Sequence, residues 1–334
     1  MKFKVSHLSI LAVLLTGISS NVNAVEHNKL DVFYYSLSDQ YISSFKEQLD
    51  SVAKEQNLTL ETYDANNDAG TQELQIASTL SNHQTKIINL VQPVITDEVI
   101  ENCKKEDSRL VFFNRQPDLN MLDGFAKAWY VEGDSMQAGQ LQAEMVDNYI
   151  KKHPEVDRNK DGRISAILLT GPQDHQATYL RTTTVINELS GKYNNIDIKA
   201  KLNGEFDSFK ARGELENFVI HNGVDQVELI ICNNDAMALG ALSVINNEGF
   251  NTGDKTKNYI PVFGIDAIEP ALKAIEENKL EGTLVNDTKE QVKAILKLAT
   301  SKETDNKKLE KELKLKISKN GTVYVPYTRV IKKN

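Results

Sequence analysis

The stretch VELIICNND, from Val227 to Asp235, contains a short apolar run that ends abruptly in three polar residues. The run is rich in β-branched residues and does not alternate with polar ones, which predicts a strand buried on both faces, as in parallel sheets. Similar runs recur along the chain, at residues 30–35, 58–63, 86–90, 109–113, 164–169, 196–202, 260–263 and 283–285. Between the runs, apolar residues at spacings of three and four predict amphipathic helices, as in Ile42, Phe45 and Leu49.

Strands and helices that alternate in this way predict parallel sheets covered by helices on both faces. The 334 residues are more than one compact core usually needs. A helical stretch at 138–150, followed by a polar stretch at 151–162, separates two similar halves. We therefore predict an α/β fold of two doubly wound parallel-sheet lobes. Near the end, residues 312–318 and 322–327 alternate around Asn320-Gly321, which predicts a hairpin.

The first 24 residues predict a cleavable signal peptide. They contain two lysines, an apolar stretch too short to span a membrane, and the small-x-small sequence Val22-Asn23-Ala24. A buried N-terminal helix is the alternative, but the run lacks amphipathic spacing. No cysteine lies near the cleavage point, so we expect a free periplasmic protein rather than a lipid-anchored one.

The composition, with 40% hydrophobic and 26% charged residues, is that of a folded protein. Because the signal segment carries two lysines and no acidic residue, its removal changes the formal net charge from −8 to −10. An acidic surface argues against nucleic-acid binding and favours a soluble monomer.

The two cysteines lie in different sequence contexts. Cys103 belongs to a polar helical stretch, whereas Cys232 ends an apolar strand. We expect them in different domains and therefore predict two separate thiols rather than a disulfide. No metal-ligand spacing links them, and the six histidines show no paired spacing, so nothing supports a zinc or copper site.

Polar side chains follow most of the predicted strands. Because ligands of open parallel sheets bind beyond the carboxyl ends of the strands, these positions form the candidate site. They are residues 36–41, 114, 175–181, 205–207, 233–235, 264–266 and 286–287. The set combines carboxylates, amides, an arginine, a histidine and aromatic rings, which is the chemistry of a sugar site. For Asn233, Asp235 and Asp287, helix capping is an equally good interpretation.

Motifs typical of enzymes are absent from the sequence. There is no Gly-rich dinucleotide or phosphate loop and no Gly-x-Ser-x-Gly nucleophile motif. His175 could in principle act as a general base, but no nucleophile or cofactor loop lies near it in sequence. We therefore expect a binding protein and not an enzyme.

The strongest local motif is DRNKDGRIS, from Asp157 to Ser165. It matches the first nine positions of an EF-hand calcium loop, with oxygen ligands at alternating positions and Gly162 at the sharp turn. The twelfth position fails, because Leu168 replaces the bidentate Glu. The residues alone therefore leave two interpretations: a polar surface turn, or a cation site completed by a distant carboxylate.

Taken together, the chain resembles the periplasmic D-galactose/D-glucose-binding proteins of bacterial sugar uptake. The resemblance covers essentially the whole chain after the signal segment. It rests on the motifs VFFN (111–114), KAWYV (127–131), the 157–165 loop, RTT (181–183), NNDAMA (233–238), PVFGIDA (261–267) and GTLVND (282–287).

The resemblance implies a type I periplasmic binding protein of an ABC transporter, with two lobes that close over one sugar. A three-stranded hinge would join an N-terminal lobe, residues 25–133 and 288–323, to a C-terminal lobe, residues 134–287 and 324–334. The implied sugar contacts are Asp39, Asn114, His175, Arg181, Asn234, Asp266 and Asn286, with Tyr41 and Phe206 stacking on the sugar. A membrane ABC permease is the implied partner, and a chemoreceptor is a further candidate.

The resemblance also implies a structural Ca²⁺ ion. The loop would supply most of the ligands, and a remote glutamate, here Glu228, would complete the site. The implied ligands are Asp157, Asn159, Asp161, Arg163, Ser165 and Glu228.

Several positions depart from the family pattern. Ala177 stands where the family usually has an Asp, Tyr41 where it has Phe, Phe206 where it has Trp, and Ser165 where it commonly has Gln. Losing the acceptor at Ala177 leaves the sugar open between galactose, glucose, a galactoside, and a different monosaccharide or glycoside. A repressor-type sugar sensor is a remote alternative, because it would need a DNA-binding headpiece. A sugar-processing enzyme ranks third.

Overall fold

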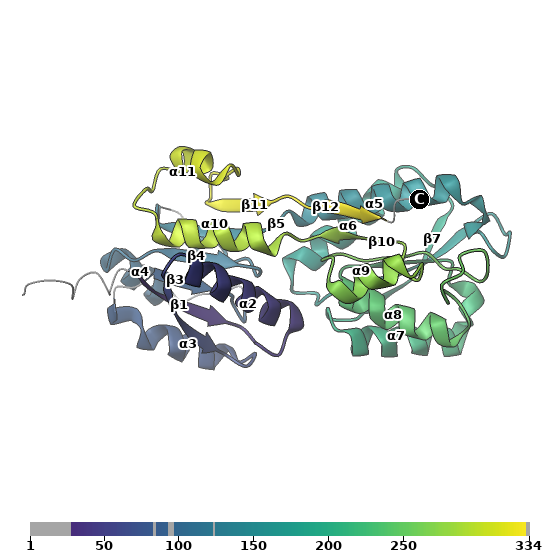
Figure 1. Ribbon diagram of the computed structural model, residues 1–334, viewed down its shortest axis with the longest axis horizontal. Helices are drawn as coiled ribbons and strands as arrows, with labels where there is room; N and C mark the ends of the chain where they lie inside the picture. The colour runs from purple at the N-terminus through teal and green to yellow at the C-terminus, as the bar shows by residue number, and fades with distance from the viewer. Residues whose placement is uncertain (1–27, 83–84, 93–96, 123, 332–334) are drawn as a thin grey trace, which may run out of the picture.

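The computed structural model describes residues 28–82, 85–92, 97–122 and 124–331. The predicted signal peptide at 1–24 lies outside these residues. Two α/β lobes lie side by side (Figure 1), each built on a mainly parallel sheet with helices on both faces. The predicted fold class is therefore confirmed. Among the described helices, none combines the length and apolar character that a membrane crossing requires.

The first lobe is built on a six-stranded sheet in the order β11-β5-β4-β3-β1-β2, and all neighbouring strands are parallel. Its strands are β1 (Lys29–Tyr34), β2 (Thr59–Asp64), β3 (Thr85–Ile88), β4 (Leu110–Phe113), β5 (Ala128–Gly133) and β11 (Thr322–Val325). Its helices are α2 (Gln40–Glu55), α3 (Ala69–Ser78), α4 (Asp97–Lys105), α10 (Thr288–Thr300) and α11 (Asn306–Leu313), with short 3₁₀ turns at Leu80–Asn82 and Leu119–Leu122.

The second lobe repeats this plan in the order β12-β10-β9-β8-β6-β7, where only the β10–β12 pair is antiparallel. Its strands are β6 (Ile164–Thr170), β7 (Ile196–Asn203), β8 (Leu229–Cys232), β9 (Val262–Phe263), β10 (Gly282–Val285) and β12 (Thr328–Ile331). Its helices are α5 (Ser135–Lys152), α6 (Gln176–Ser190), α7 (Ser208–Asn222), α8 (Asp235–Asn247) and α9 (Glu269–Glu276), with 3₁₀ turns at Pro154–Val156 and Val224–Gln226.

The chain passes between the lobes three times: from β5 into α5, from β10 into α10, and from β11 into β12. Figure 1 shows β11 and β12 nearly end to end, one over each lobe. All of β11 belongs to the first sheet, so the last crossing lies just beyond the predicted boundary at residue 323. These three connections form the hinge.

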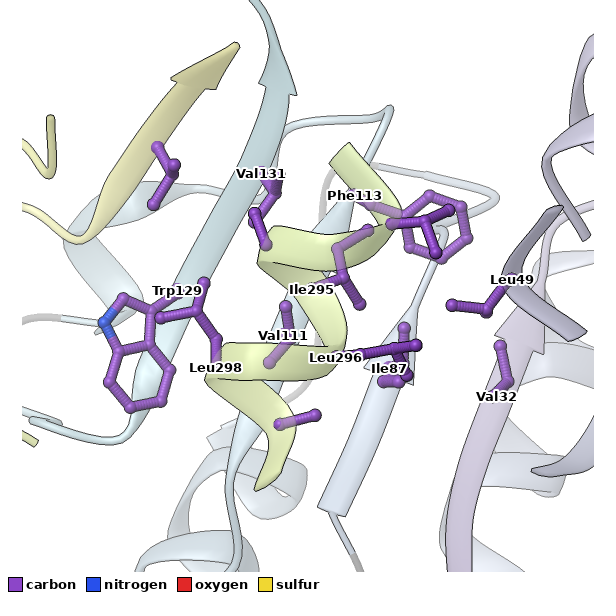
Figure 2. Packing of buried hydrophobic residues seen from close by; sticks show 14 of the residues in the cluster. Val32, Leu49, Ile87, Val111, Phe113, Trp129, Val131, Ile295, Leu296 and Leu298 are labelled. Atoms are coloured by element: carbon purple, nitrogen blue, oxygen red, sulfur yellow. The ribbon is translucent and has the colours of Figure 1, made fainter. Parts of the chain in front are cut away.

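Helix α10 follows the second lobe in sequence but packs in the core of the first. Its Ile295, Leu296 and Leu298 are fully buried and lie against Val111 and Trp129 of the sheet (Figure 2). Burying a side chain of this kind stabilises a fold by about 1.5–3 kcal/mol. Packing of this helix therefore fixes the second crossing, and with it the loop that precedes α10.

Two expectations about strands need correction. The predicted hairpin forms only at its turn: Ser318 donates to the carbonyl of Thr322 across Asn320-Gly321 at 2.8 Å, and one antiparallel bridge joins Ile317 to Val323. The first of its two strands does not form, because α11 extends to Leu313 and Lys314 then turns the chain in a left-handed conformation. Strand β11 pairs instead with β5, because this buries its apolar side chains in the lobe core, which an isolated hairpin could not do. The list of predicted apolar runs also lacks strand β5, which is fully buried and has four apolar residues before Glu132.

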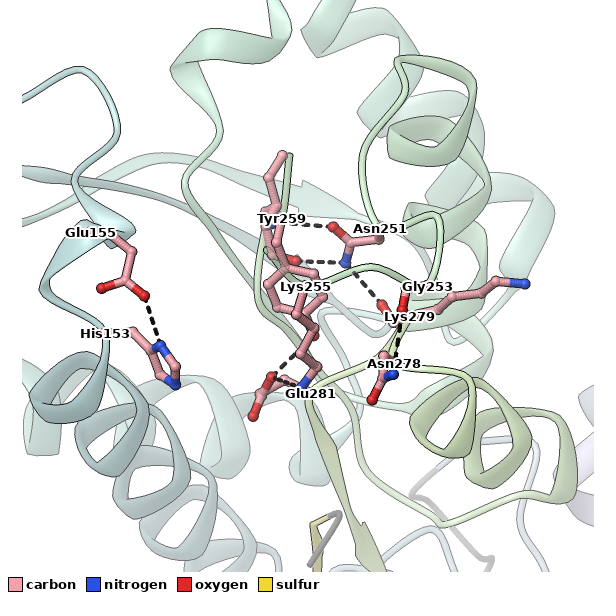
Figure 3. Close-up of polar contacts among 10 residues, drawn as sticks. His153, Glu155, Asn251, Gly253, Lys255, Tyr259, Asn278, Lys279 and Glu281 are labelled. Atoms are coloured by element: carbon pink, nitrogen blue, oxygen red, sulfur yellow. Dashed lines mark hydrogen bonds and ion pairs between the residues drawn. The ribbon is translucent and has the colours of Figure 1, made fainter. Parts of the chain in front are cut away.

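Both cysteines are buried free thiols in different lobes, which confirms the prediction. The polar segment after α8 is held by Asn251, which is buried and has a left-handed φ of 51°. Its Nδ2 donates to the carbonyl oxygens of Ile260 and Lys279, and its Oδ1 accepts from the N–H of Ile260, each at 2.8 Å. Figure 3 shows Asn251 between these segments. The segment is thereby fixed to the second lobe.

Candidate functional site

A cavity of about 470 Å³ lies between the two lobes, a size typical of sites for small molecules. Its walls come from strand ends and helix starts of both lobes. All nine predicted sugar-contact residues line it: Asp39, Tyr41, Asn114, His175, Arg181, Phe206, Asn234, Asp266 and Asn286. Ala177 lines it as well. Residues spread over most of the chain thus converge on one space.

Several of these residues also cap helices, so the capping and binding interpretations are compatible. Asp39, His175 and Asn234 each accept a backbone N–H at the start of a helix while lining the cavity. Of the three residues for which capping was an open alternative, only Asp287 is a cap. Asn233 and Asp235 instead brace the surrounding loops.

Asn233 and Asp235 are both buried and act on neighbouring segments. Oδ1 of Asn233 accepts from the hydroxyl of Thr182 at 3.0 Å. Asp235 accepts from the hydroxyl of Thr283 at 2.6 Å and from the N–H of Ile268 at 3.0 Å. These contacts hold the cavity loops of the second lobe in place.

The first lobe contributes a short network at the ends of β1 and β4. The hydroxyl of Tyr35 donates to Asp39, whose other oxygen accepts from the N–H of Ile42 at 3.0 Å. Asn114 adopts a left-handed φ of 62°, and its Oδ1 accepts from the side chain of Asn89 at 3.2 Å. Both cavity side chains are therefore oriented before any ligand arrives.

Near the second crossing, three predicted residues contact one another. Nδ2 of Asn286 donates to the hydroxyl of Tyr41 at 3.1 Å and to Asp266 at 3.2 Å, while its Oδ1 accepts from Gln291 at 2.6 Å. Burial raises the pKa of Asp266 to about 6, although Arg181 and Asn286 oppose the shift. Asp266 also has a φ of 119°, which is a strained backbone conformation for a residue other than glycine.

Arg181 is the buried cation of the cavity. It donates to the carbonyl of Asn233 at 2.7 Å and to the hydroxyl of Tyr327 at 2.8 Å. The Tyr327 ring comes close because residue 133 is glycine, where a Cβ would lie 2.5 Å from that hydroxyl. Nε of Arg181 is buried and has no hydrogen-bond partner within the described residues.

His175 and Phe206 form one aromatic corner, with ring centroids 5.3 Å apart and perpendicular planes. Phe206 has a left-handed φ of 59°, and Gly171 leaves room for its ring, because a Cβ there would lie 2.3 Å from it. Nδ1 of His175 accepts from the N–H of Ala177 at 3.2 Å. The proton of the neutral ring therefore sits on Nε2.

We predict that His175 stays neutral across the pH range in which proteins of this kind work. Burial, with Arg115 and Arg181 nearby, lowers its pKa to about 3. Since an unfolded histidine protonates near pH 6.5, this group supports folding above that pH and loses its contribution as the pH falls toward 3. Imidazole ¹⁵N NMR at pH 5.5 should show a neutral Nε2–H ring, assigned by its loss in His175→Asn. A cationic ring at pH 5.5 would contradict this.

Sequence reasoning missed several residues that also line the cavity, namely Tyr35, Arg115, Glu132 and Tyr327. Arg115 forms an ion pair with Asp174 at 3.3 Å and so joins the two lobes. Glu132 carried a usable signal, since a charged residue at the end of an otherwise apolar strand is unusual. Tyr327 carried none, because its position depends on the third crossing.

The loop at 157–165 folds back on its own backbone. The Asp157 carboxylate accepts from the N–H groups of Asp161 and Gly162 at 3.2 and 2.9 Å, and Asn159 Oδ1 accepts from Asp161 at 2.8 Å. Gly162 has a φ of 82°, as the sharp turn requires. Arg163 and Ser165 follow at the start of β6.

Glu228, far away in sequence, lies fully buried beneath this loop. Its Oε1 accepts from the N–H groups of Arg158 at 2.8 Å and Asn159 at 3.2 Å, and its Oε2 accepts from Ser165 at 2.9 Å. The remote glutamate therefore does reach the loop. In the described part of the chain, no three His, Cys, Asp or Glu side chains converge as a metal site, and calcium binding stays a prediction.

Comparisons with known proteins agree with this architecture. A family model described as a periplasmic binding protein domain matches residues 30–307. The chain is 30% identical over 333 residues to the D-galactose/methyl-galactoside binding periplasmic protein MglB of Haemophilus influenzae, covering 99% of this chain and 98% of that protein. It is 26% identical to a xylitol-binding protein of Mycolicibacterium smegmatis, over 86% of this chain and 76% of that protein.

The fold is also similar to that of solved structures. An ABC transporter periplasmic solute binding protein from Actinobacillus succinogenes, solved with bound D-allose, aligns with a TM-score of 0.73 at 18% identity. The alignment covers 91% of this chain and 97% of that structure.

Proposed function

Because this chain belongs to the periplasmic binding protein family, we propose that it is a periplasmic sugar receptor that closes around one hexose or galactoside and delivers it to an ABC permease. Members of this family bind solutes for transport and do not convert them, so the chain is a binding protein and not an enzyme.

One observation carries the proposal: the nine polar and aromatic residues expected of a sugar site line a single cavity between the lobes. Asp39 and Asp266 supply acceptors for hydroxyl groups, Arg181 supplies a buried donor, and Tyr41 and Phe206 supply ring faces. Because both lobes contribute, a ligand held by both favours the closed arrangement.

The test combines thermal unfolding with mass spectrometry of the recovered sugar. A bound hexose or galactoside should raise the melting temperature, because it binds only the folded state, and should be recovered chemically unchanged. Loss or conversion of the sugar would point to an enzyme. No shift with any hexose or hexoside would overturn the proposal.

Ala177 supports a preference for galactosides over free galactose. It is a small residue in the cavity wall, so it leaves space and supplies no side-chain acceptor. We expect methyl-galactoside to bind more tightly than galactose, and Ala177→Asp to reverse the order by tightening free galactose roughly 10-fold or more. Calorimetry of both sugars with both proteins measures this, and tighter binding of glucose than of either galactose compound would contradict it.

We also propose that the 157–165 loop binds a structural Ca²⁺ ion. Asp157, Asn159, Asp161, Ser165 and Glu228, with the carbonyl of Arg163, offer an all-oxygen donor set, which suits a hard cation. The bound ion would offset the carboxylate charge and tie the loop to β8. A role in chemotaxis, through contact with a chemoreceptor, is compatible with this fold but rests on the family resemblance alone.

A further inference from the structure

Glu132 is a carboxylate of the first lobe that neither the strand pattern nor the family resemblance assigned to the site. It lies on β5, immediately before the first crossing between the lobes, and it lines the cavity. Its side chain is buried, with only 4% of the residue exposed. A buried carboxylate at this position needs a partner, because leaving such a group unpaired is costly.

The contacts of Glu132 are incomplete within the described residues. Its Oε2 accepts a hydrogen bond from the hydroxyl of Tyr130 at 2.6 Å. Its Oε1 is buried and has no hydrogen-bond partner among the residues that the structure describes. The Tyr130 hydroxyl is also 3.1 Å from the carbonyl of Asn114, a predicted sugar contact. Tyr130 thus connects the other oxygen of this carboxylate, Oε2, to the loop that carries Asn114.

Building on the proposed sugar-binding function, we propose that Glu132 is an additional ligand-binding and specificity residue, whose free oxygen accepts a hydrogen bond from a hydroxyl of the bound sugar. The position explains why a carboxylate is tolerated in an otherwise apolar strand. Glu132 also supplies a charged acceptor in a cavity where Ala177 supplies none. A sugar hydroxyl would then be recognised beside the first crossing between the lobes and not at residue 177.

The surroundings of Glu132 give the proposal a pH signature. Burial raises the pKa of Glu132 to about 7, while Tyr130 and Arg181 oppose the shift and Asp134 adds to it. The titratable groups around it are Tyr130 and Asp134 on its own segment, Arg181 on α6, Tyr324 on β11 and Tyr327 after β11. Since a hydroxyl donates best to the ionised carboxylate, sugar affinity should rise as the pH passes from 6 to 8.

The folded protein gives a separate readout. A carboxylate with a raised pKa supports folding below its unfolded pKa and loses that contribution as the pH rises through its folded value. At pH 8, Glu132 therefore opposes folding of the sugar-free protein. Glu132→Gln should leave the melting temperature of that protein unchanged or higher, whereas a residue needed only for hinge structure would lower it.

The experiment is calorimetry of galactose and methyl-galactoside at pH 6 and pH 8 with wild type, Glu132→Gln and Glu132→Ala. We expect Glu132→Ala to weaken binding roughly 10- to 100-fold at pH 8, and Glu132→Gln to weaken it less and to remove the rise near pH 7. Asp266, whose pKa is about 6, accounts for a smaller rise between pH 6 and pH 8 that remains in Glu132→Gln. The matched control is Glu144→Gln on α5, where an exposed glutamate pairs with Arg329 at 2.8 Å and should not affect binding.

Each outcome separates the two proposals. If wild type binds none of these sugars, the proposed function fails. If wild type binds and both Glu132 variants bind equally well with the same pH dependence, only the role of Glu132 is overturned. Weaker binding that accompanies a lower melting temperature in both variants would also overturn it, in favour of a structural role.

Discussion

Replacing Arg181 with alanine is expected to weaken sugar binding by roughly 100-fold or more. The guanidinium lines the cavity and is already fixed by Asn233 and Tyr327, so its N–H groups that make neither of these bonds can donate to a ligand without further ordering of the side chain. Hydrogen bonds from charged donors contribute about 1.5–3 kcal/mol each. Arg181→Lys should restore little of the lost affinity, because an ammonium group cannot reproduce the planar set of N–H donors of a guanidinium. Calorimetry with galactose and methyl-galactoside measures the loss.

A structural control accompanies this prediction. Removing Arg181 also leaves the Asn233 carbonyl and the Tyr327 hydroxyl with one partner fewer, so the melting temperature should fall modestly. Arg212→Ala, at an exposed site on α7, removes an arginine without touching the cavity and should change neither property. An Arg181→Ala protein that is folded and binds both sugars as tightly as wild type would contradict the assigned role.

The second large effect is on stability, at Glu228. Three backbone N–H groups of the calcium-type loop donate to this buried carboxylate, so Glu228→Ala leaves all three without their acceptor. We expect the free energy of unfolding to fall by about 3 kcal/mol or more, even without metal. If the proposed Ca²⁺ ion binds, a chelator should lower the melting temperature of wild type and have little further effect on Glu228→Ala.

The comparison needs a surface control. Glu216→Ala, which removes an exposed glutamate of α7 in a 4.0 Å ion pair, should be nearly neutral and should keep the response to chelator. Wild-type melting that is insensitive to chelator, together with no calcium by elemental analysis, would reduce the loop to a turn held by Glu228. Unchanged stability in Glu228→Ala would contradict the hydrogen-bond account itself.

The sequence predicted the two-lobe α/β fold because its strands are continuous apolar runs, such as residues 229–232, which only a sheet covered on both faces can bury. It also predicted the cavity residues, because strand ends are a property of the local pattern. It failed at residues 312–318, where the alternation imitates a strand but α11 extends to Leu313 and only Ile317 bridges to β11. It also failed at Glu132 and Tyr327, whose roles depend on how the crossings bring β5 and the end of β11 together.

The most direct test of a hexose or galactoside receptor is native mass spectrometry of the refolded protein, incubated with a mixture of galactose, methyl-galactoside, ribose and xylitol. These ligands differ in mass, so one spectrum reports which of them the cavity retains. We predict a one-to-one complex with galactose or methyl-galactoside that is absent from Arg181→Ala. A complex with only ribose or xylitol, or no complex at all, would contradict the account.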